Sequence, residues 1–318
     1  MYFQHGEEDE KDKTLTDVAK IWLKSDPSFQ WSPKRFLNIS IDHILKNLPL
    51  FQKEVQCPIL FNPSHPNYFS EVEKASKWKY NVSEAEFWKE IENDKNSGDI
   101  CESIKTKYSF LTEPFSLEEY EYPIAYGMLV TKDIRQMTLM LSAFYQPQNA
   151  YCIAIDGKAT DAFKNRMKIF QSCFPNIHVF IVNTNVSWCG QEIPKTVLSC
   201  VQKLNELNHA WKYFQYLSGV DLPLKTNLEM VRIFKALNGT FNANVYNLYP
   251  ERYRKGGTPP LPILISSLSA TFSRASANVI SKHPLVYKLL KFLEKTYCPD
   301  ESVWATIAGN PGCTLLFF

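Results

Sequence analysis

Two carboxylates in this sequence have settings suited to acid–base or ligand-binding chemistry. Glu301 ends the segment Cys298-Pro-Asp-Glu301, and Asp156 directly follows the apolar run Tyr151-Cys-Ile-Ala-Ile155. A positioned glutamate can accept a proton as a general base. An aspartate at the end of a buried strand lies where open α/β sheets bind their ligands. These two residues are therefore the first candidates for a functional site.

Each candidate also has a purely structural interpretation. Asp300 could cap a following helix, with Glu301 as a first-turn charge that complements the helix dipole. Asp156 could be a solvated acid at a strand end. The segment Thr226-Asn-Leu-Glu229 is ambiguous in the same way, because it forms a capping box that opens a helix over 228–237. The residues alone favour the structural interpretations.

Other common chemistries lack their motifs in this chain. There is no G-x-S-x-G nucleophile elbow and no glycine-rich phosphate loop, which argues against hydrolases, kinases and Rossmann oxidoreductases. No CxxC pair and no Cys/His spacing typical of zinc occurs. The histidines, which likewise show no zinc-type pair spacing, are His5, His43, His65, His178, His209 and His283.

Cysteines and glycosylation sequons bear on the compartment. The eight cysteines could be small buried hydrophobes of a cytosolic core. Combined with four Asn-X-Ser/Thr sequons, they favour an oxidising lumen with disulfides. The sequons are at Asn38, Asn81, Asn185 and Asn238, and the cysteines are at positions 57, 101, 152, 173, 189, 200, 298 and 313.

The composition is that of a soluble globular protein. The 318 residues suffice for one large domain or two modest ones. The net charge of +2, without a long Lys/Arg run, argues against a nucleic-acid partner. Residues 1–18 are polar and acidic and predict a flexible leader, and no apolar run reaches membrane-spanning length. If the protein works in a lumen, its signal or membrane anchor is expected outside this chain.

The hydrophobic pattern predicts an α/β fold after a helical region over 19–118. Apolar runs over 124–130, 151–155 and 178–182 predict buried strands. Helical spacing over 132–145, 161–173 and 195–210 predicts helices between and after them. This alternation favours a parallel sheet that binds its ligand beyond the carboxyl ends of the strands, where Asp156 would lie.

Several uncommon segments, in order, resemble the core-2/I-branching β-1,6-N-acetylglucosaminyltransferase family. The resemblance runs from roughly residue 57 to 310 and implies an open mixed sheet of the GT-A type, flanked by helices. It divides the chain into a leader or stem (1–18), a helical region packed on the catalytic domain (19–118) and a C-terminally incomplete glycosyltransferase domain (119–318). The segments are Tyr122–Val130, Tyr145–Asn149, Tyr151–Asp156, Trp211–Tyr213, Ser218–Asn227 and Cys298–Ile307.

The resemblance also implies a reaction. The family transfers N-acetylglucosamine from UDP-GlcNAc to a glycan or glycoprotein acceptor, with inversion, as in β-1,6 branching of O-glycans. Its members are type II membrane proteins of the Golgi. A sugar hydroxyl needs a carboxylate to take its proton, and the leaving diphosphate needs a metal ion or fixed basic groups. Because the chain has no Asp-X-Asp motif, no metal and no other cofactor are expected.

The resemblance also implies roles for individual residues of this sequence that match the family's motifs. Glu301 matches the catalytic glutamate of the family's Ser-Pro-Asp-Glu motif, here Cys298-Pro-Asp-Glu301. The resemblance assigns donor binding to Asp156, Asp221 and Lys225, and acceptor binding to Trp188 and Arg252.

The family's cysteine pattern implies two disulfides, Cys101–Cys173 and Cys152–Cys200. Cys57 matches a cysteine whose partner lies in a tail that the family has beyond this chain's Phe318. Cys189 and Cys298 have no family counterpart.

Three departures from the family bear on function. The tail beyond Phe318 supplies the Arg and Lys that replace a metal at the diphosphate. The acceptor-side segment Ser-Gly-Ser-Ala-Tyr-Phe stands here as Ser266-Ser-Leu-Ser-Ala-Thr271. The family's acceptor-binding Glu and Lys have no clear equivalent before Glu251-Arg252. Two alternatives therefore stay open: a xylosyltransferase-like enzyme, and a catalytically inactive lumenal protein that binds glycan or nucleotide.

Overall fold

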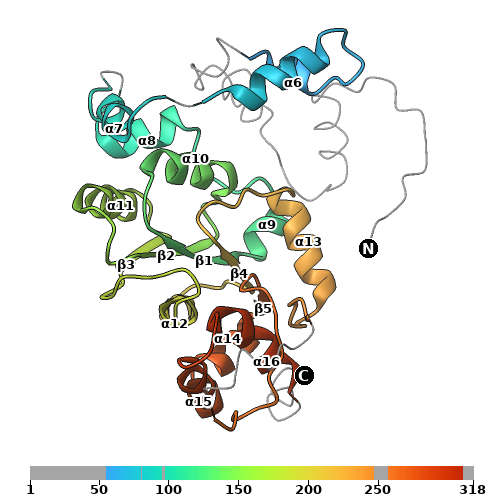
Figure 1. The fold of residues 1–318 in the computed structure, drawn as a ribbon. Helices are drawn as coiled ribbons and strands as arrows, with labels where there is room; N and C mark the ends of the chain where they lie inside the picture. The colour runs from blue at the N-terminus through green and yellow to red at the C-terminus, as the bar shows by residue number, and fades with distance from the viewer. Residues whose placement is uncertain (1–54, 80, 95–96, 247–256, 311–318) are drawn as a thin grey trace. The chain divides into compact units, whose positions relative to one another are not determined.

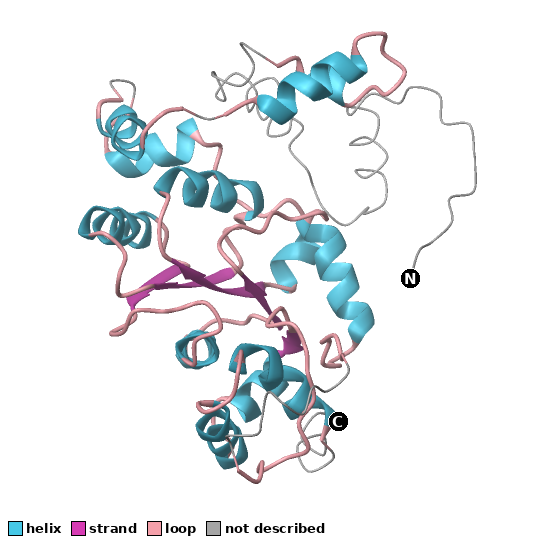
Figure 2. Cartoon of the chain, in the orientation of Figure 1, coloured by secondary structure: helices cyan, strands magenta, loops and turns pink. Residues whose placement is uncertain are grey.

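The computed structural model describes residues 55–79, 81–94, 97–246 and 257–310. All of them belong to one compact unit that spans Ile41–Phe318. The predicted leader over 1–18 lies outside the described residues, and the boundaries at 18 and 118 stay predictions. Figure 1 shows the arrangement of the elements and Figure 2 separates helices from strands.

Short helices precede the sheet, as the sequence predicts. They are α5 (Cys57–Leu60), α6 (Tyr68–Lys77), α7 (Glu84–Glu92), α8 (Ile100–Lys107) and α9 (Leu117–Glu121). Their starts follow from local capping: Ser83 and Glu86 form a reciprocal capping box at α7, and Asp99 accepts the N–H of Glu102 at α8. Phe87, Trp88 and Ile104 of these helices are buried in the core beside the sheet.

The centre is a five-stranded mixed sheet in the order β3-β2-β1-β4-β5. The strands β1 (Ile124–Val130), β2 (Ala150–Ile155), β3 (Ile177–Ile181) and β4 (Tyr213–Leu217) run parallel, and β5 (Thr271–Ser273) is antiparallel to β4. The connecting helices are α10 (Ile134–Phe144), α11 (Asp161–Cys173), α12 (Glu192–Glu206) and α13 (Asn227–Leu237). The predicted open mixed sheet flanked by helices is confirmed.

The two faces of the sheet carry side chains of different size. Tyr126, Met128, Tyr151 and Ile153 pack on the face covered by α10 and α11. On β1 and β2 the opposite face, toward α12, presents small residues, which are Ala125, Ala150, Cys152 and Ala154. At Gly127 an added Cβ would meet the Phe214 ring at 2.7 Å and the Cys200 Cβ at 3.4 Å. Small residues on this face therefore let α12 lie close against the strands.

A helical segment completes the side of the sheet that α12 covers. It consists of α14 (Arg274–Ile280), α15 (Pro284–Leu293), the 3-10 turn η2 (Pro299–Ser302) and α16 (Val303–Gly309). Phe272 of β5 stacks on Phe214 and also contacts Trp304, with ring centroids 4.9 and 5.4 Å apart. These contacts attach α16, which directly follows η2, to the edge strand of the sheet.

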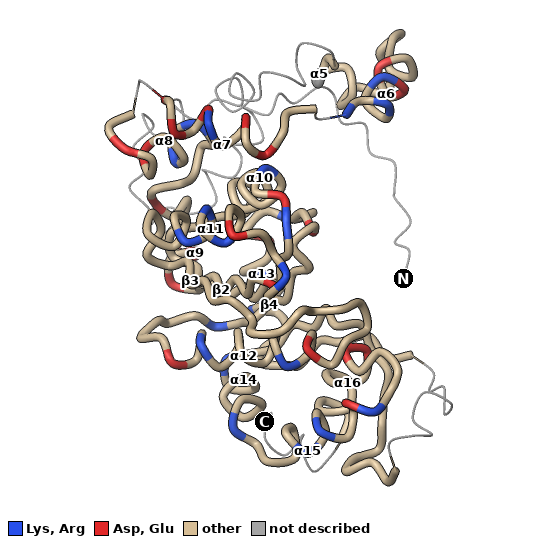
Figure 3. Tube along the Cα trace, turned by 60° about the vertical axis from the view of Figure 1, so that its left-hand side comes forward, with Lys and Arg blue, Asp and Glu red and all other residues tan. Residues whose placement is uncertain are grey.

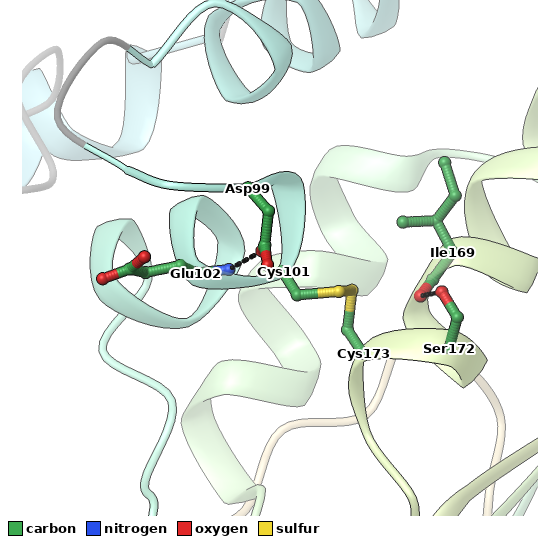
Figure 4. Close-up of a disulfide and its surroundings, with 6 residues drawn as sticks. All are labelled: Asp99, Cys101, Glu102, Ile169, Ser172 and Cys173. Atoms are coloured by element: carbon green, nitrogen blue, oxygen red, sulfur yellow. Dashed lines mark hydrogen bonds between the residues drawn. A yellow bond between two sulfur atoms is a disulfide. The ribbon is translucent and has the colours of Figure 1, made fainter.

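The predicted disulfide between Cys101 and Cys173 is present. It joins α8 to the last residue of α11, with the two Cα atoms 5.0 Å apart. Figure 4 shows the cysteine of α8 beside the cap formed by Asp99 and Glu102. The helical N-terminal region is thereby covalently attached to the α/β core.

Charge and hydropathy of the described part are unremarkable. Basic and acidic residues are interspersed along the helices (Figure 3). Within the described ranges, none of the helices combines the length and apolar character needed to cross a bilayer.

Candidate functional site

Asp156 lies at the carboxyl edge of the parallel strands and ties three segments together. Its Oδ1 accepts the backbone N–H groups of Lys158 (3.1 Å) and Val186 (3.0 Å). Its Oδ2 lies 3.3 Å from the Thr131 hydroxyl and 3.3 Å from the Lys158 ammonium. Only 1% of the residue is exposed. The aspartate thus joins the ends of β1 and β2 to the loop that follows β3.

The charge of Asp156 is stabilised despite this burial. Burial alone raises the pKa of the carboxyl group, but hydrogen bonds from Val186 and Lys158 and the positive charge of Lys158 outweigh it. The net pKa lies below its ordinary value. The carboxylate is therefore ionised at neutral pH and fully engaged with the protein.

The loop after β3 forms a tight turn that presents Trp188. The N–H of Gly190 donates to the carbonyl of Ser187 at 3.0 Å, so Trp188 and Cys189 are the central residues. Cys189 has a left-handed backbone, with φ of 55°. Trp188 is 82% exposed, and its ring meets Tyr297 edge-on at 6.4 Å.

A disulfide links this turn to the segment that carries Glu301. Cys189 pairs with Cys298, with the two Cα atoms 4.1 Å apart. Cys298 also has a left-handed backbone (φ 46°) and immediately precedes η2. Its carbonyl accepts the N–H of Glu301 at 3.1 Å, which closes a second tight turn. The turn carrying Trp188 and the turn carrying Glu301 are therefore neighbours in space.

Glu301 itself is half-buried and its backbone is anchored. The Glu301 carbonyl accepts the N–H of Ser266 at 2.6 Å. The Ser266 hydroxyl in turn accepts the N–H of Ala305 in α16 at 3.2 Å. Ser266 begins the predicted acceptor-side segment 266–271, so that segment packs directly on the one that carries Glu301.

Asp221 and Lys225 lie apart from this group, in the segment after β4 that crosses the face of β1 and β4 beside α10. Both line a pocket of about 260 Å³ between β4, α10 and the start of α13. The carboxylate of Asp221 accepts the N–H of Ser218 at 2.6 Å, and Lys225 pairs with Glu229 at 3.5 Å. The pocket lining is mostly apolar and includes neither Asp156 nor Glu301.

The sequence matches one family model over residues 124–315, described as Core-2/I-Branching enzyme. This range contains the whole predicted site, from Asp156 to Glu301. The chain belongs to the Core-2/I-Branching enzyme family.

Curated relatives agree with this assignment. Beta-1,3-galactosyl-O-glycosyl-glycoprotein beta-1,6-N-acetylglucosaminyltransferase of Bos taurus is 34% identical over 244 residues, covering 70% of this chain and 57% of that protein. The human protein of the same name is 34% identical over 231 residues, covering 66% of this chain and 54% of that protein. The enzyme numbered 3 from Ovis aries is 33% identical, covering 66% of this chain and 52% of that protein. The chain thus spans about half the length of the curated relatives it matches.

Solved structures are more distant. A crystal structure of S. aureus TarS, residues 1–349, has a TM-score of 0.34 and 11% identity, and covers 54% of this chain and 56% of that chain.

In this Core-2/I-Branching chain the predicted residues fall into two groups. Trp188 and Glu301 are brought together by the Cys189–Cys298 disulfide, and Asp156 is connected to them through Val186. Asp221 and Lys225 form the second group, in the pocket beside α13. Arg252 and Asn38 lie outside the described residues. The other sequon residues, Asn81, Asn185 and Asn238, are exposed.

The predicted disulfide between Cys152 and Cys200 is wrong for this structure. Both are free, buried cysteines, and the Cys200 thiol donates to the Cys152 carbonyl at 3.4 Å. Burial is the main reason that the pKa of the Cys152 thiol lies well above its ordinary value. In this structure the Cys200 thiol is a hydrogen-bond donor to the backbone of β2, and α12 is held against the sheet by packing and this hydrogen bond rather than by a crosslink.

Sequence reasoning missed the Cys189–Cys298 pair. The two cysteines are 109 positions apart, and neither has a counterpart in the family. Their signal was indirect: they are two of the four cysteines that remain after the family pairs are assigned, in a chain expected in an oxidising lumen. Together with Asp300 they are also the one group among the described residues whose atoms could hold a metal ion. Because the two sulfurs are bonded to each other, they are not available as thiolate ligands.

Proposed function

We propose that this Core-2/I-Branching family member transfers N-acetylglucosamine from UDP-GlcNAc to a glycan acceptor, with inversion. The observation that carries the proposal is the similarity to beta-1,6-N-acetylglucosaminyltransferases at 33–34% identity. The same relatives favour N-acetylglucosamine over xylose as the sugar. Branching of O-glycans is the proposed role, since the relatives act on galactosyl-O-glycosyl-glycoproteins by name.

The proposed chemistry assigns one role to each part of the site. Glu301 accepts the proton of the acceptor hydroxyl as that oxygen attacks the anomeric carbon. The hydrogen bond from Ser266 anchors the backbone of this half-buried glutamate. Trp188 offers an exposed aromatic face to an acceptor sugar. Asp156 contacts the uridine, or holds the loop that does, and Asp221 and Lys225 contribute to the donor side.

No metal and no other cofactor take part in the proposal. The negative charge that develops on the leaving UDP is then stabilised by basic side chains, in keeping with the absence of an Asp-X-Asp motif. The proposed location is the Golgi lumen, with attachment to the membrane through an anchor outside this chain. The Cys101–Cys173 and Cys189–Cys298 disulfides support an oxidising compartment.

The test is a transfer assay on the full-length protein with UDP-GlcNAc and UDP-xylose, using a core-1 O-glycan as acceptor. Glu301→Gln should lower kcat by about 10²–10⁴-fold, the usual contribution of a general base, and leave UDP affinity nearly unchanged. Glu294→Gln is the matched control, because Glu294 ends the neighbouring helix α15 in ion pairs with Lys195 and Lys291.

The outcomes separate the alternatives. Transfer from UDP-xylose alone would establish the xylosyltransferase-like function. UDP binding without transfer from either donor would establish an inactive binding protein. Near-normal kcat in Glu301→Gln would remove the glutamate from the mechanism and leave it as a helix-terminus charge.

A further inference from the structure

The Cys189–Cys298 disulfide joins the two turns that carry proposed acceptor-side and proton-accepting residues. Trp188 precedes one cysteine, and Glu301 follows the other by three positions. Cys298 stands where the family motif has a serine, and Cys189 has no family counterpart. The crosslink is therefore a feature of this chain within the site, beyond what the family assigns.

The backbone at both ends of the disulfide is in an unfavourable conformation. Cys189 has φ of 55° and Cys298 has φ of 46°, in the left-handed region that L-residues with side chains avoid. Each cysteine also belongs to a turn closed by a hydrogen bond, from Gly190 to Ser187 and from Glu301 to Cys298. Such conformations persist where the surroundings over-determine them, which is common at ligand-binding sites. Here the sulfur bond is one of the constraints that hold both turns.

The disulfide also completes a connection between Asp156 and Glu301. The Asp156 carboxylate accepts the N–H of Val186, and the Lys158 ammonium donates to the Val186 carbonyl. Cys189 lies three residues after Val186. Asp156 is thus connected to the Glu301 turn by its hydrogen bond to Val186, the loop from Val186 to Cys189, and the disulfide to Cys298.

The two turns differ in how else they are held. The Glu301 turn is also held by Ser266. The Ser266 backbone N–H donates to the Glu301 carbonyl, and the Ser266 hydroxyl accepts the N–H of Ala305. The tip of the other turn, by contrast, is the exposed Trp188, which meets Tyr297 edge-on. Tyr297 is itself 55% exposed and precedes Cys298. Without the disulfide, the turn that carries Trp188 would lose its covalent attachment to the segment that carries Glu301.

We propose that the Cys189–Cys298 disulfide is a positioning crosslink: it sets the Trp188–Tyr297 aromatic pair at a fixed place relative to the Glu301 carboxylate. The pair and the carboxylate then act on one acceptor sugar, the aromatic rings through its apolar face and Glu301 through its hydroxyl. This inference rests on the proposed function. Donor binding is independent of the crosslink, because Asp156 holds Val186 whether or not the sulfurs are joined.

The test compares two double variants of the full-length protein. Cys189→Ser/Cys298→Ser removes the crosslink at the site, and Cys101→Ser/Cys173→Ser removes the one between α8 and α11 as a matched control. Peptide mapping without reduction should first find the fragment that links Cys189 to Cys298 in the unmodified protein; two free thiols there would overturn the proposal.

Kinetics separate positioning from stability. The site variant should raise the acceptor KM and lower kcat by about 10- to 100-fold, the scale expected when reacting groups lose alignment by about 1 Å. Its donor KM should stay within about twofold. The control variant should lower Tm with both kinetic constants unchanged. If the two variants behave alike, losing Tm but keeping kcat and KM, the disulfide serves stability only and the proposal fails.

A second readout does not depend on activity. Hydrogen exchange should be faster in the site variant over 187–190 and over 298–302, with β2 and the Val186 N–H unchanged. Unchanged exchange in both turns would contradict the proposal. If the unmodified protein transfers no sugar from any donor, the proposed function fails, and the exchange measurement still decides whether the crosslink holds the two turns together.

Discussion

Asp156 combines a structural and a proposed ligand-binding role in one side chain. It receives hydrogen bonds from three segments, through Thr131, Lys158 and Val186. The pattern of an apolar run followed by an acid predicts its place at the sheet edge. Its partner Val186 could not be predicted, because the two residues are 30 positions apart and meet only once β3 is paired with β2.

The first residue-scale prediction concerns Asp156→Asn. Because hydrogen bonds to a charged group contribute about 1.5–3 kcal/mol, the variant should lose stability of that order at neutral pH. The folded pKa of Asp156 is lowered, so its contribution is complete above the unfolded pKa of about 3.9 and is lost as pH falls through the folded pKa. The difference in unfolding free energy between wild type and Asp156→Asn should therefore shrink as pH falls. Urea unfolding of the two proteins at pH values from 7 to 3 measures this difference.

Asp161→Asn is the control for this experiment, since the Asp161 side chain is 96% exposed at the start of α11. It should change stability little at any pH. If the unfolding free energies of wild type and Asp156→Asn differed by the same amount at pH 3 and at pH 7, the charge of Asp156 would not be what stabilises the fold. UDP affinity should fall with Asp156→Asn if the residue, or the Val186 loop it holds, contacts the donor.

A second prediction at this scale concerns metal ions. The proposed reaction relies on basic side chains at the leaving diphosphate, so chelation with EDTA should leave the transfer rate unchanged. The measurement compares initial rates with EDTA, with added Mn²⁺ and with neither. Abolition by EDTA and rescue by Mn²⁺ would refute the metal-free mechanism.

At the scale of elements, hydrophobic period predicts the first three strands and the helices that follow them, but not β4 or the helices after β5. The runs and spacings locate β1, β2, β3, α10 and α11, and the capping box locates α13, within about two residues of their observed bounds. The helix predicted over 195–210 ends earlier, at Glu206. The Trp211 indole N–H donates to the Leu204 carbonyl, which takes over an acceptor that a longer helix would use. Strand β5 has only three residues, which is too short for a periodic hydrophobic pattern, and it forms by pairing with β4.

The capping box of α13 allows a prediction about one element. Thr226 accepts the N–H of Glu229, whose side chain returns to the N–H of Thr226. Thr226→Ala should therefore cost about 0.5–2 kcal/mol of unfolding free energy. Because residues 221–227 line the pocket beside α13, this variant should also weaken UDP-sugar binding if that pocket serves the donor.

Ser83→Ala is the matched control, as it removes the same type of box from α7, which does not line this pocket. Similar losses of stability are expected in denaturant, with a loss of donor affinity only in Thr226→Ala. Equal donor affinities in Thr226→Ala and Ser83→Ala would mean that the pocket beside α13 does not bind the donor.

At the scale of the whole molecule, the Cys101–Cys173 crosslink attaches the N-terminal helices to the α/β core. Cys101→Ser/Cys173→Ser should lower the free energy of unfolding by about 2–5 kcal/mol, as removal of native disulfides typically does. Differential scanning calorimetry under non-reducing conditions measures the change. No loss of stability would mean that packing of Phe87, Trp88 and Phe170 alone holds this attachment.

The two disulfides close loops that follow one another along the chain, over 101–173 and 189–298, without overlap. Two rings in series restrict the denatured chain independently, so their contributions of about 2–4 kcal/mol each add. The sum, about 4–8 kcal/mol, is comparable with the lower part of the net stability of a typical domain, which is about 5–15 kcal/mol. A chain synthesised in a reducing cytosol would consequently lack much of the free energy that keeps it folded. The redox state of the cellular compartment is thus expected to change how large a fraction of this sequence populates its native structure.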